Sequence, residues 1–260
     1  MSTARALPPG QRRIEGFPRF GTHLHRPPPQ TPRDHHIEIR GAGMDAFVVP
    51  LPTFRALPRV SRTRDFHCVG GWTATDVHWE GVTFPTLYEH LIAPRLATGT
   101  EITHVTFGGL DGYRSVVCAE DVMDDDVLVV DVLDGEPLSP DHGAPLRLVS
   151  PKQYGFISTK HLSLIELHTV EPDFDFGAAS SLARLGLRLI VFRRHPRSRV
   201  WLEERHGYLP GPVVRRFYRP LIPLIRRVSA TRSLSRPGSD RGLSFRGGMR
   251  VQGSTEDVPG

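Results

Sequence analysis

Hydrophobic residues, many of them β-branched or aromatic, are concentrated in six short stretches of the first two thirds of the chain. Gly, Pro, Asp and Ser residues bound these stretches, as is typical of strands. In the last two stretches hydrophobic and polar positions alternate, which indicates strands buried on one face. The sequence therefore predicts strands at residues 45–51, 63–69, 101–107, 127–133, 144–150 and 162–168.

Two short helices are predicted between these strands. Thr83 is placed to cap a helix over residues 86–93, with Pro85 in its first turn and Pro94 at its end. Residues 119–126 predict a second short helix. Strands and helices together predict an α+β fold that is rich in β-structure.

The two ends of the chain have a different pattern. Residues 1–42 show little periodicity, and the prolines within 25–34 predict extended backbone. Leucines at helical spacing predict a helix over residues 181–194, and residues 213–227 are basic and partly amphipathic. The last 30 or so residues, rich in Ser, Gly and Arg, are predicted to be disordered.

The chain is thus expected to consist of a folded domain, 1–176, and an arginine-rich, partly helical extension, 177–260. Residues 1–180 carry a net charge of −7 and residues 181–260 one of +12, within a total of +5. A GC-rich genome explains arginine in place of lysine, but not this asymmetry. The basic end therefore leaves open a non-enzymatic binding protein that docks on nucleic acid, an anionic membrane or an acidic protein.

No targeting or membrane segment is predicted. Arg12 and Arg13 are not followed by the apolar run that a secretory or twin-arginine signal needs. The best apolar stretch, 185–192, is too short to span a bilayer and contains Arg188. We expect a cytoplasmic protein, and the two cysteines of the chain fit a reducing compartment.

Cys68 is the first candidate for chemistry. It follows His67 and precedes Gly70 and Gly71, which allow a sharp turn that exposes a thiolate to a ligand. A free cysteine is also commonly a small buried hydrophobic residue, and the local pattern leaves both interpretations open. Cys118, within SVVCAED, fits the buried interpretation.

Two further segments carry groups that bind anions. DHGAPLRL at 141–148 places His142 and Arg147 in a turn before a strand. YGFISTK at 154–160 offers hydroxyls, backbone N–H groups and the Lys160 ammonium to a phosphate. Taken alone, the first segment favours a surface loop with one structural arginine, and the second is a weak pattern that many proteins match by chance.

Three segments of the chain are informative when they are considered together and in their order along the sequence. They are FPRFGTHLHRPPP at 17–29, DFHCVGGWTATDVHWEGV at 65–82 and LDGEPLSPDHGAPLRLVSPKQYGFISTKHLSLIEL at 133–167. Together they resemble the molybdopterin-binding domain of the sulfite oxidase family, which includes sulfite oxidases, plant-type nitrate reductases and a methionine sulfoxide reductase catalytic subunit. The resemblance covers about residues 17–170 and implies the β-rich mixed fold of that family.

The resemblance implies molybdenum and molybdopterin as cofactors, with Cys68 as the thiolate ligand of the metal. A soft sulfur donor suits a metal that the pterin dithiolene also holds. Tyr113 falls where the family often places an active-site tyrosine. The residues implied to contact the pterin or its phosphate are Arg19, Phe20, Thr22, His23, His142, Arg147, Ser158, Thr159 and Lys160.

The implied reaction is the transfer of one oxygen atom to or from a small substrate, a sulfite-like anion or a sulfoxide. Sulfite oxidases place an anion-binding arginine five residues after the cysteine, but this chain has Thr73 there, with Arg114 or Arg19 as possible substitutes. No haem motif is present, so electrons are expected to pass to a separate electron-transfer protein or haem subunit. The basic extension suggests peripheral membrane contact, and nucleic acid is disfavoured as a partner.

Overall fold

Two β-sheets contain most of the regular structure in the computed structural model, which describes residues 6–19, 27–172, 195, 197–205 and 210–218. The first sheet contains β1 (Arg12–Ile14), β4 (Val60–His67), β5 (Trp72–Thr83), β8 (Leu128–Leu133), β9 (Glu136–Pro137) and β10 (Arg147–Val149). The second contains β2 (His36–Gly41), β3 (Met44–Pro50), β6 (His104–Gly109), β7 (Arg114–Cys118) and β11 (Leu162–His168).

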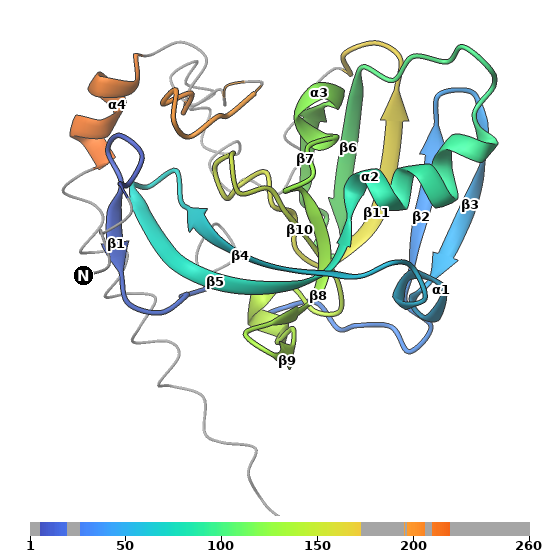
Figure 1. Ribbon diagram of the computed structural model, residues 1–260, viewed down its shortest axis with the longest axis horizontal. Coiled ribbons are helices and arrows are strands. Elements are labelled where there is room, and N and C mark those ends of the chain that lie inside the picture. The colour runs from blue at the N-terminus through green and yellow to red at the C-terminus, as the bar shows by residue number, and fades with distance from the viewer. Residues whose placement is uncertain (1–5, 20–26, 173–194, 196, 206–209, 219–260) are drawn as a thin grey trace, which may run out of the picture.

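The long strand β5 organises the first sheet, in which the order is β1-β5-β8-β10. Its first residues pair in parallel with β1, its length pairs antiparallel with β4, and its second half pairs antiparallel with β8. β5 therefore reaches from the β1 end of the molecule to the second sheet, with β4 running along it (Figure 1). In the second sheet the order is β3-β2-β11-β6-β7, and only β2 and β11 pair in parallel.

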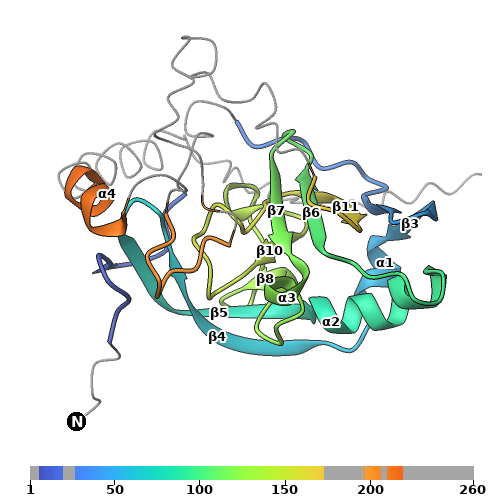
Figure 2. The same cartoon turned by 90° about the horizontal axis from the view of Figure 1, so that it is seen from above.

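Short helices connect the strands: α1 (Leu51–Arg55), α2 (Phe84–Leu87), α3 (Ala119–Val122) and, near the C-terminus, α4 (Gly211–Tyr218). A π-helical turn, Tyr88–Ile92, and a 3-10 turn, Ala93–Arg95, continue α2. α4 lies at the same end of the molecule as β1 in both views (Figure 2). No helix among the described residues is long and apolar enough to cross a membrane.

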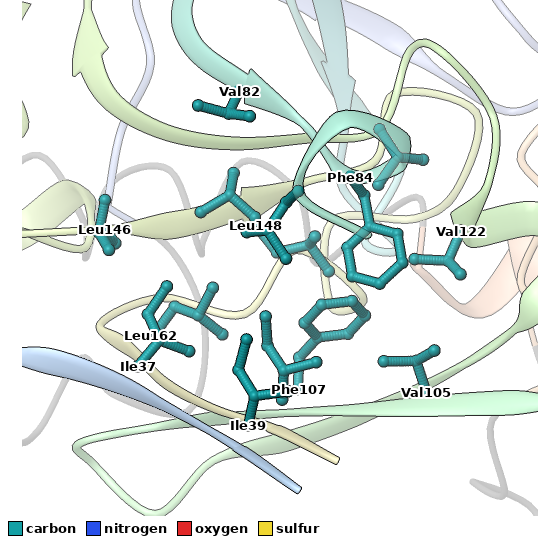
Figure 3. Packing of buried hydrophobic residues seen from close by; sticks show 14 of the residues in the cluster. Ile37, Ile39, Val82, Phe84, Val105, Phe107, Val122, Leu146, Leu148 and Leu162 are labelled. Atoms are coloured by element: carbon teal, nitrogen blue, oxygen red, sulfur yellow. The ribbon is translucent and has the colours of Figure 1, made fainter. Parts of the chain in front are cut away.

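The main hydrophobic core lies between the two sheets (Figure 3). Val82 and Leu148 of the first sheet face Ile37, Ile39 and Phe107 of the second, and all five are buried. Burial of each such side chain stabilises the fold by about 1.5–3 kcal/mol relative to exposure. This core holds β10 and β11 in place, and with them the loop that joins the two strands.

A second hydrophobic cluster, rich in aromatic residues, contains the side chains of the first part of β5, within residues 72–79. The rings of Phe17 and Phe66 are 4.8 Å apart between centroids, and Phe17 meets Trp79 edge-on at 5.5 Å. Trp72 and Cys68 are buried in the same cluster. The N-terminal segment is therefore packed onto β4 and β5 by its aromatic side chain.

The six predicted strands are confirmed as β3, β4, β6, β8, β10 and β11, with boundaries shifted by up to three residues. The Thr83 cap is also confirmed, since its hydroxyl accepts a hydrogen bond from the Thr86 amide at 3.1 Å. The helix predicted over 119–126 ends at Val122.

Five strands of the described residues were not predicted: β1, β2, β5, β7 and the two-residue β9. In β5 a bulge breaks the two-residue period, because Asp76 adopts a left-handed φ of 59° and Ala74 and Val77 both face the interior. The residues of β2 do alternate, but they lie in the proline-rich part of the chain that was taken to lack periodicity.

Part of the C-terminal region is packed on the domain. Val200 and Ser198 are fully buried, and Arg199 forms an isolated β-bridge with Gln153. α4 overlaps the start of the predicted amphipathic segment 213–227, whereas the helix predicted over 181–194 and the last 30 residues lie outside the described residues. The boundary at residue 176 stays a prediction.

Substitution of Gly81 tests how closely the backbones of β5 and β8 approach each other. A Cβ atom at this position would lie 2.1 Å from the Val129 carbonyl oxygen. We expect Gly81→Ala to lower the free energy of unfolding by about 2–3 kcal/mol, because the backbone of β8 must move. As a control, Gly99→Ala meets no atom within 4 Å and has only its φ of +83° to strain, so it should cost about 1 kcal/mol. Urea denaturation of both variants checks this difference, and equal losses would contradict the close approach.

Candidate functional site

Cys68 begins a tight turn that joins β4 to β5. Its amide donates to the Trp72 carbonyl at 2.8 Å, and the Gly71 amide donates to the Cys68 carbonyl at 2.9 Å. Gly71 has a φ of +94°, which favours glycine, and the Gly70 amide points at the sulfur, 3.4 Å from Sγ. The two glycines thus form the turn that the sequence predicted.

The thiol of Cys68 is buried, with 7% of the residue exposed, so the predicted exposed thiolate is wrong for this structure. Burial raises the pKa of the thiol to about 12, against smaller opposing effects of the Gly70 amide and of Arg205. The physical reason is that Cys68 packs in the aromatic cluster with Trp72. Cys118, at the end of β7, is half-buried, with its sulfur 3.6 Å from Nε2 of His104.

Three buried polar side chains, those of Gln11, Thr73 and His67, form a chain of hydrogen bonds that reaches the turn. The Gln11 side-chain amide donates to the Cys68 carbonyl at 3.1 Å and accepts from the Thr73 hydroxyl at 3.1 Å. The Thr73 hydroxyl is also 2.9 Å from Nδ1 of His67. Thr73, which replaces the expected arginine, is therefore fully buried and engaged on two sides.

Arg205 contacts the same turn and was not predicted from the sequence. One Nη donates to the Val69 carbonyl, and the other donates to the carbonyls of Pro9 and Gly10 at 3.4 and 3.3 Å. Its guanidinium lies over the ring of Tyr154, 5.0 Å from the centroid. The sequence carries no local signal for this role, because Arg205 is one of many arginines in the basic C-terminal region.

Arg147 is a second buried cation, and it lies close to side chains of β4 and β5. Its guanidinium lies 5.2–5.6 Å from the ring centroids of Phe17, Phe66 and Trp79. One Nη donates to the His142 carbonyl at 3.0 Å, whereas the buried Nη2 has no hydrogen-bond partner among the described residues. Burial lowers the pKa of this side chain to about 9.

Three further basic residues lie near Arg147: Lys160, Arg19 and His142. Lys160 forms a β-bridge with Arg147 and donates to the Asp141 carbonyl at 2.7 Å. Arg19 forms an ion pair with the Asp141 carboxylate at 3.2 Å, and Nε2 of His142 is 2.7 Å from the Phe17 carbonyl. Burial, with the nearby charges of Arg147 and Arg19, lowers the pKa of Lys160 to about 7. The pKa of His142 is likewise lowered by burial.

Ser158 and Thr159 lie in the loop that leads to Lys160, and both are buried. The Ser158 hydroxyl accepts from the Ser150 amide at 3.1 Å, and the Thr159 hydroxyl is 2.7 Å from that of Ser115. Tyr113 reaches the same loop, since its hydroxyl donates to the Phe156 carbonyl at 2.5 Å. Phe20, Thr22 and His23 lie outside the described residues.

The loop of residues 154–160 joins the cysteine turn to the cluster of cations. The Gly155 amide donates to the His67 carbonyl at 2.7 Å. A Cβ atom on Gly155 would lie 2.4 Å from the ring of Phe66, so only glycine lets the loop approach β4 this closely. The loop of residues 154–160 therefore connects the strand that leads to Cys68 with Lys160, which forms a β-bridge with Arg147, although these residues are far apart in sequence.

Comparison with known proteins decides which family this arrangement represents. Residues 23–174, more than half of the chain, match the family described as the oxidoreductase molybdopterin binding domain. This chain belongs to that family. The fold and the resemblance predicted from the three sequence segments are thereby confirmed at the level of the family.

Individual relatives of this molybdopterin-binding domain are distant. It is 29% identical over 131 residues to the uncharacterized oxidoreductase YuiH of Bacillus subtilis, covering 50% of this chain and 64% of that protein. It is 25% identical to the mitochondrial sulfite oxidase of Drosophila melanogaster, over 73% of this chain and 40% of that protein. It is 33% identical to the protein-methionine-sulfoxide reductase catalytic subunit MsrP of Xanthomonas campestris pv. campestris, over 46% of this chain and 39% of that protein.

Among solved structures, the sulfane dehydrogenase SoxCD of Paracoccus pantotrophus aligns with a TM-score of 0.45 and 21% identity. That alignment covers 52% of this chain and 38% of the other. The chain therefore spans less than two thirds of the length of each of these relatives.

The residues of the site fit molybdopterin, the group after which the family is described. Three cations, Arg19, Arg147 and Lys160, lie near two carboxylates, those of Asp141, which Arg19 already binds, and Asp111. Burial of an uncompensated guanidinium costs several kcal/mol, so an anion beside Arg147 would offset a penalty that the ligand-free fold carries. The unpartnered Nη2 of Arg147 is a donor for such an anion, as the phosphate of molybdopterin would be.

Lys160 makes the ligand-free domain less stable at neutral and acidic pH. Its pKa falls from 10.5 in the unfolded chain to about 7 in the folded one. Between these values the unfolded chain holds more protons, so stability rises with pH. We expect Lys160→Met to raise the free energy of unfolding of the ligand-free protein, with a gain that is full below about pH 7 and shrinks towards pH 10.5.

The only other lysine of the chain provides the control. Lys152 is exposed and paired with Asp124, which raises its pKa, so the effect of Lys152→Met should stay flat between pH 6 and pH 9.5. Denaturant titrations of the two variants at these two pH values make the comparison. A Lys160→Met gain that is the same at both values would mean that the lysine is not desolvated.

Proposed function

We propose that the chain is the catalytic molybdenum–molybdopterin domain of an oxidoreductase that transfers one oxygen atom to or from a small substrate. The observation that carries this proposal is the buried Arg147, whose Nη2 has no hydrogen-bond partner among the described residues, in a chain that belongs to the oxidoreductase molybdopterin binding domain family. Lys160 beside it adds a second cation with no carboxylate bonded to its ammonium among the described residues. When bound, the molybdenum centre supplies the two-electron oxygen-atom chemistry, and the protein supplies binding and orientation.

In this proposal Cys68 is the protein ligand of the metal. Its sulfur is a soft donor, and the turn presents it beside the N–H of Gly70. The raised pKa means that the free thiol keeps its proton at neutral pH, so metal binding must release that proton. Arg147 and Lys160, with the loop of Ser158 and Thr159, would hold the phosphate, while His142 and Arg19 would border the pterin.

The substrate that these residues favour is a neutral oxide, such as a sulfoxide, over sulfite. Sulfite is an anion and needs a cation near the metal, but Thr73 is buried and hydrogen-bonded to two neighbours. Arg114 is half-exposed and 3.6 Å from Glu166, and Arg19 is paired with Asp141. Both arginines proposed as substitutes thus already have carboxylate partners.

We further propose that electrons are exchanged with a separate protein. The related MsrP is named as a catalytic subunit, and a second relative, YedZ1 of Azospira oryzae, is named as a putative subunit of the same kind of reductase. A cytoplasmic location is proposed as well, and the two free cysteines are compatible with it. The alternative of a binding protein that acts through its basic end stays a prediction, because most of those arginines lie outside the described residues.

Metal and pterin content tests the proposal directly. Protein purified from a host that makes molybdopterin should contain close to one molybdenum and one pterin per chain. Cys68→Ser should keep the pterin and lose turnover, because a hydroxyl is a poor replacement for a soft thiolate. Arg147→Met should lose most of the pterin, by about tenfold in occupancy, the loss expected for one charge-assisted hydrogen bond.

Cys118→Ser is the matched control, since this second thiol lies on the other sheet and should change neither content nor turnover. A wild-type protein with only traces of molybdenum from a competent host would overturn the proposal. Full activity of Cys68→Ser would overturn the assignment of the ligand.

Substrate charge is tested with the loaded enzyme. We expect reduction of a neutral sulfoxide by a chemically reduced dye to proceed, and sulfite-dependent dye reduction to be at least tenfold slower in kcat/KM. The reason is that Arg114 and Arg19, the arginines considered as substitutes at this site, are paired with carboxylates, and one hydrogen bond to a charged group is worth about 1.5–3 kcal/mol. Efficient sulfite oxidation with a KM in the micromolar range would contradict the role given to Thr73.

A further inference from the structure

The C-terminal residues 195 and 197–205 lie beyond the part of the chain that matches the family, which ends at residue 174. They nevertheless bring Arg205 to the turn of residues 68–71, here called the cysteine turn. We propose that Arg205 is a positioning residue that locks the cysteine turn in the geometry needed to bind the metal. This inference rests on the proposed function only for the identity of the group that Cys68 binds.

Three carbonyls of the cysteine turn, those of Cys68, Val69 and Gly71, accept a hydrogen bond from another segment. The Cys68 carbonyl accepts from Gln11, and the Gly71 carbonyl accepts from the Arg12 amide at 3.0 Å. The Val69 carbonyl accepts from Arg205. The other nitrogen of Arg205 binds the Pro9 and Gly10 carbonyls, so one guanidinium ties the turn to the segment that precedes β1.

Burial makes this contact stronger than a surface hydrogen bond. Arg205 is 1% exposed and stacks on Tyr154, and no carboxylate of the described residues lies within ion-pair distance of it. A charged donor in such surroundings forms hydrogen bonds about twice as strong as neutral ones.

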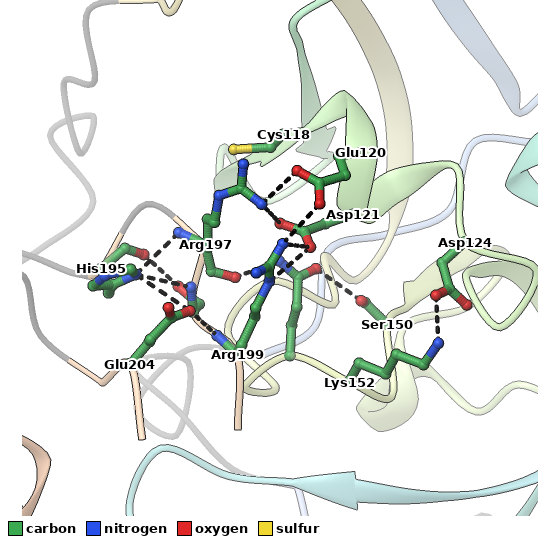
Figure 4. A network of polar contacts seen from close by, with 12 residues as sticks. Cys118, Glu120, Asp121, Asp124, Ser150, Lys152, His195, Arg197, Arg199 and Glu204 are labelled. Atoms are coloured by element: carbon green, nitrogen blue, oxygen red, sulfur yellow. Dashed lines mark hydrogen bonds and ion pairs between the residues drawn. The ribbon is translucent and has the colours of Figure 1, made fainter. Parts of the chain in front are cut away.

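The segment that carries Arg205 is itself held rigidly (Figure 4). Arg197 pairs with Glu120 at 2.6 Å, and Arg199 pairs with Asp121 at 2.8 Å, both on α3. Backbone bonds join the segment to the loop after β10, where the Val200 amide donates to the Lys152 carbonyl at 3.0 Å. Arg205 therefore approaches the turn from a fixed support, and little entropy has to be lost to place it.

The reactivity of Cys68 in the metal-free protein reports the position of the turn. The chain has one other thiol, Cys118, which serves as an internal reference in the same sample. We expect Arg205→Met, which keeps the apolar stem over Tyr154 but removes the donors, to speed alkylation of Cys68 by iodoacetamide about tenfold relative to Cys118. That factor corresponds to the loss of one hydrogen bond from a charged donor.

Arg205→Lys should rescue part of the effect, because an ammonium can hold the Val69 carbonyl but not all three carbonyls at once. Arg197→Met removes one exposed ion pair, while Arg199 and the backbone bond of Val200 still hold the segment, so the Cys68 rate should stay within about twofold of wild type. Hydrogen exchange of the Gly71 amide, bonded to the Cys68 carbonyl, should follow the same order of variants.

The inference is overturned if Arg205→Met and Arg197→Met accelerate Cys68 equally, or if the Cys68 and Cys118 rates rise together, as a general loosening would cause. If Arg205→Met does not fold, the comparison of wild type with Arg205→Lys decides, and equal Cys68 rates would overturn the inference. Neither measurement needs molybdenum. An absence of metal from the purified wild-type protein would therefore count against the proposed function alone.

Discussion

The burial of positive charge without matching negative charge is the constraint on which the arrangement of this domain depends. Arg147 lies among three aromatic rings, Arg205 lies over a fourth, and Lys160 is desolvated beside Arg147 and Arg19. Aromatic faces and carbonyl oxygens recover part of the cost of such burial, but not all of it. A fold that carries this penalty in the ligand-free state is one whose stability increases when an anion binds.

The same constraint explains why the two sheets are built as they are. The core between the sheets fixes β10, from which Arg147 projects, while the aromatic cluster under β5 provides the rings around its guanidinium. Gly155 brings the loop of residues 154–160 against Phe66, and this contact closes the distance between the cysteine turn and the cations. Apolar packing thus positions the charged groups, which form few ion pairs of their own.

The sequence predicts those parts of the fold and the site that depend on residues close together in the chain. Local features were readable: the Thr83 cap, the glycines after Cys68 and strands such as β6, β8 and β11 follow from short patterns. β5 was missed because its bulge at Asp76 breaks the period on which strand prediction relies. The roles proposed for Arg147 and Lys160 came from a resemblance to a family, since the burial of Arg147 among aromatic rings distant in sequence leaves no trace in its neighbouring residues.

Arg205 shows the limit of such a resemblance, because it lies beyond the family match and inside a region that composition marks as a basic extension. The acidic residues of α3 give the reason for its placement: Glu120 and Asp121 neutralise Arg197 and Arg199, which draws this part of the chain onto the domain. A surplus of arginine at one end is therefore in part a complement to the acidic surface at the other. In this domain the charge asymmetry of the sequence contributes to the fold. It holds the segment that carries Arg205, and Arg205 in turn binds the cysteine turn.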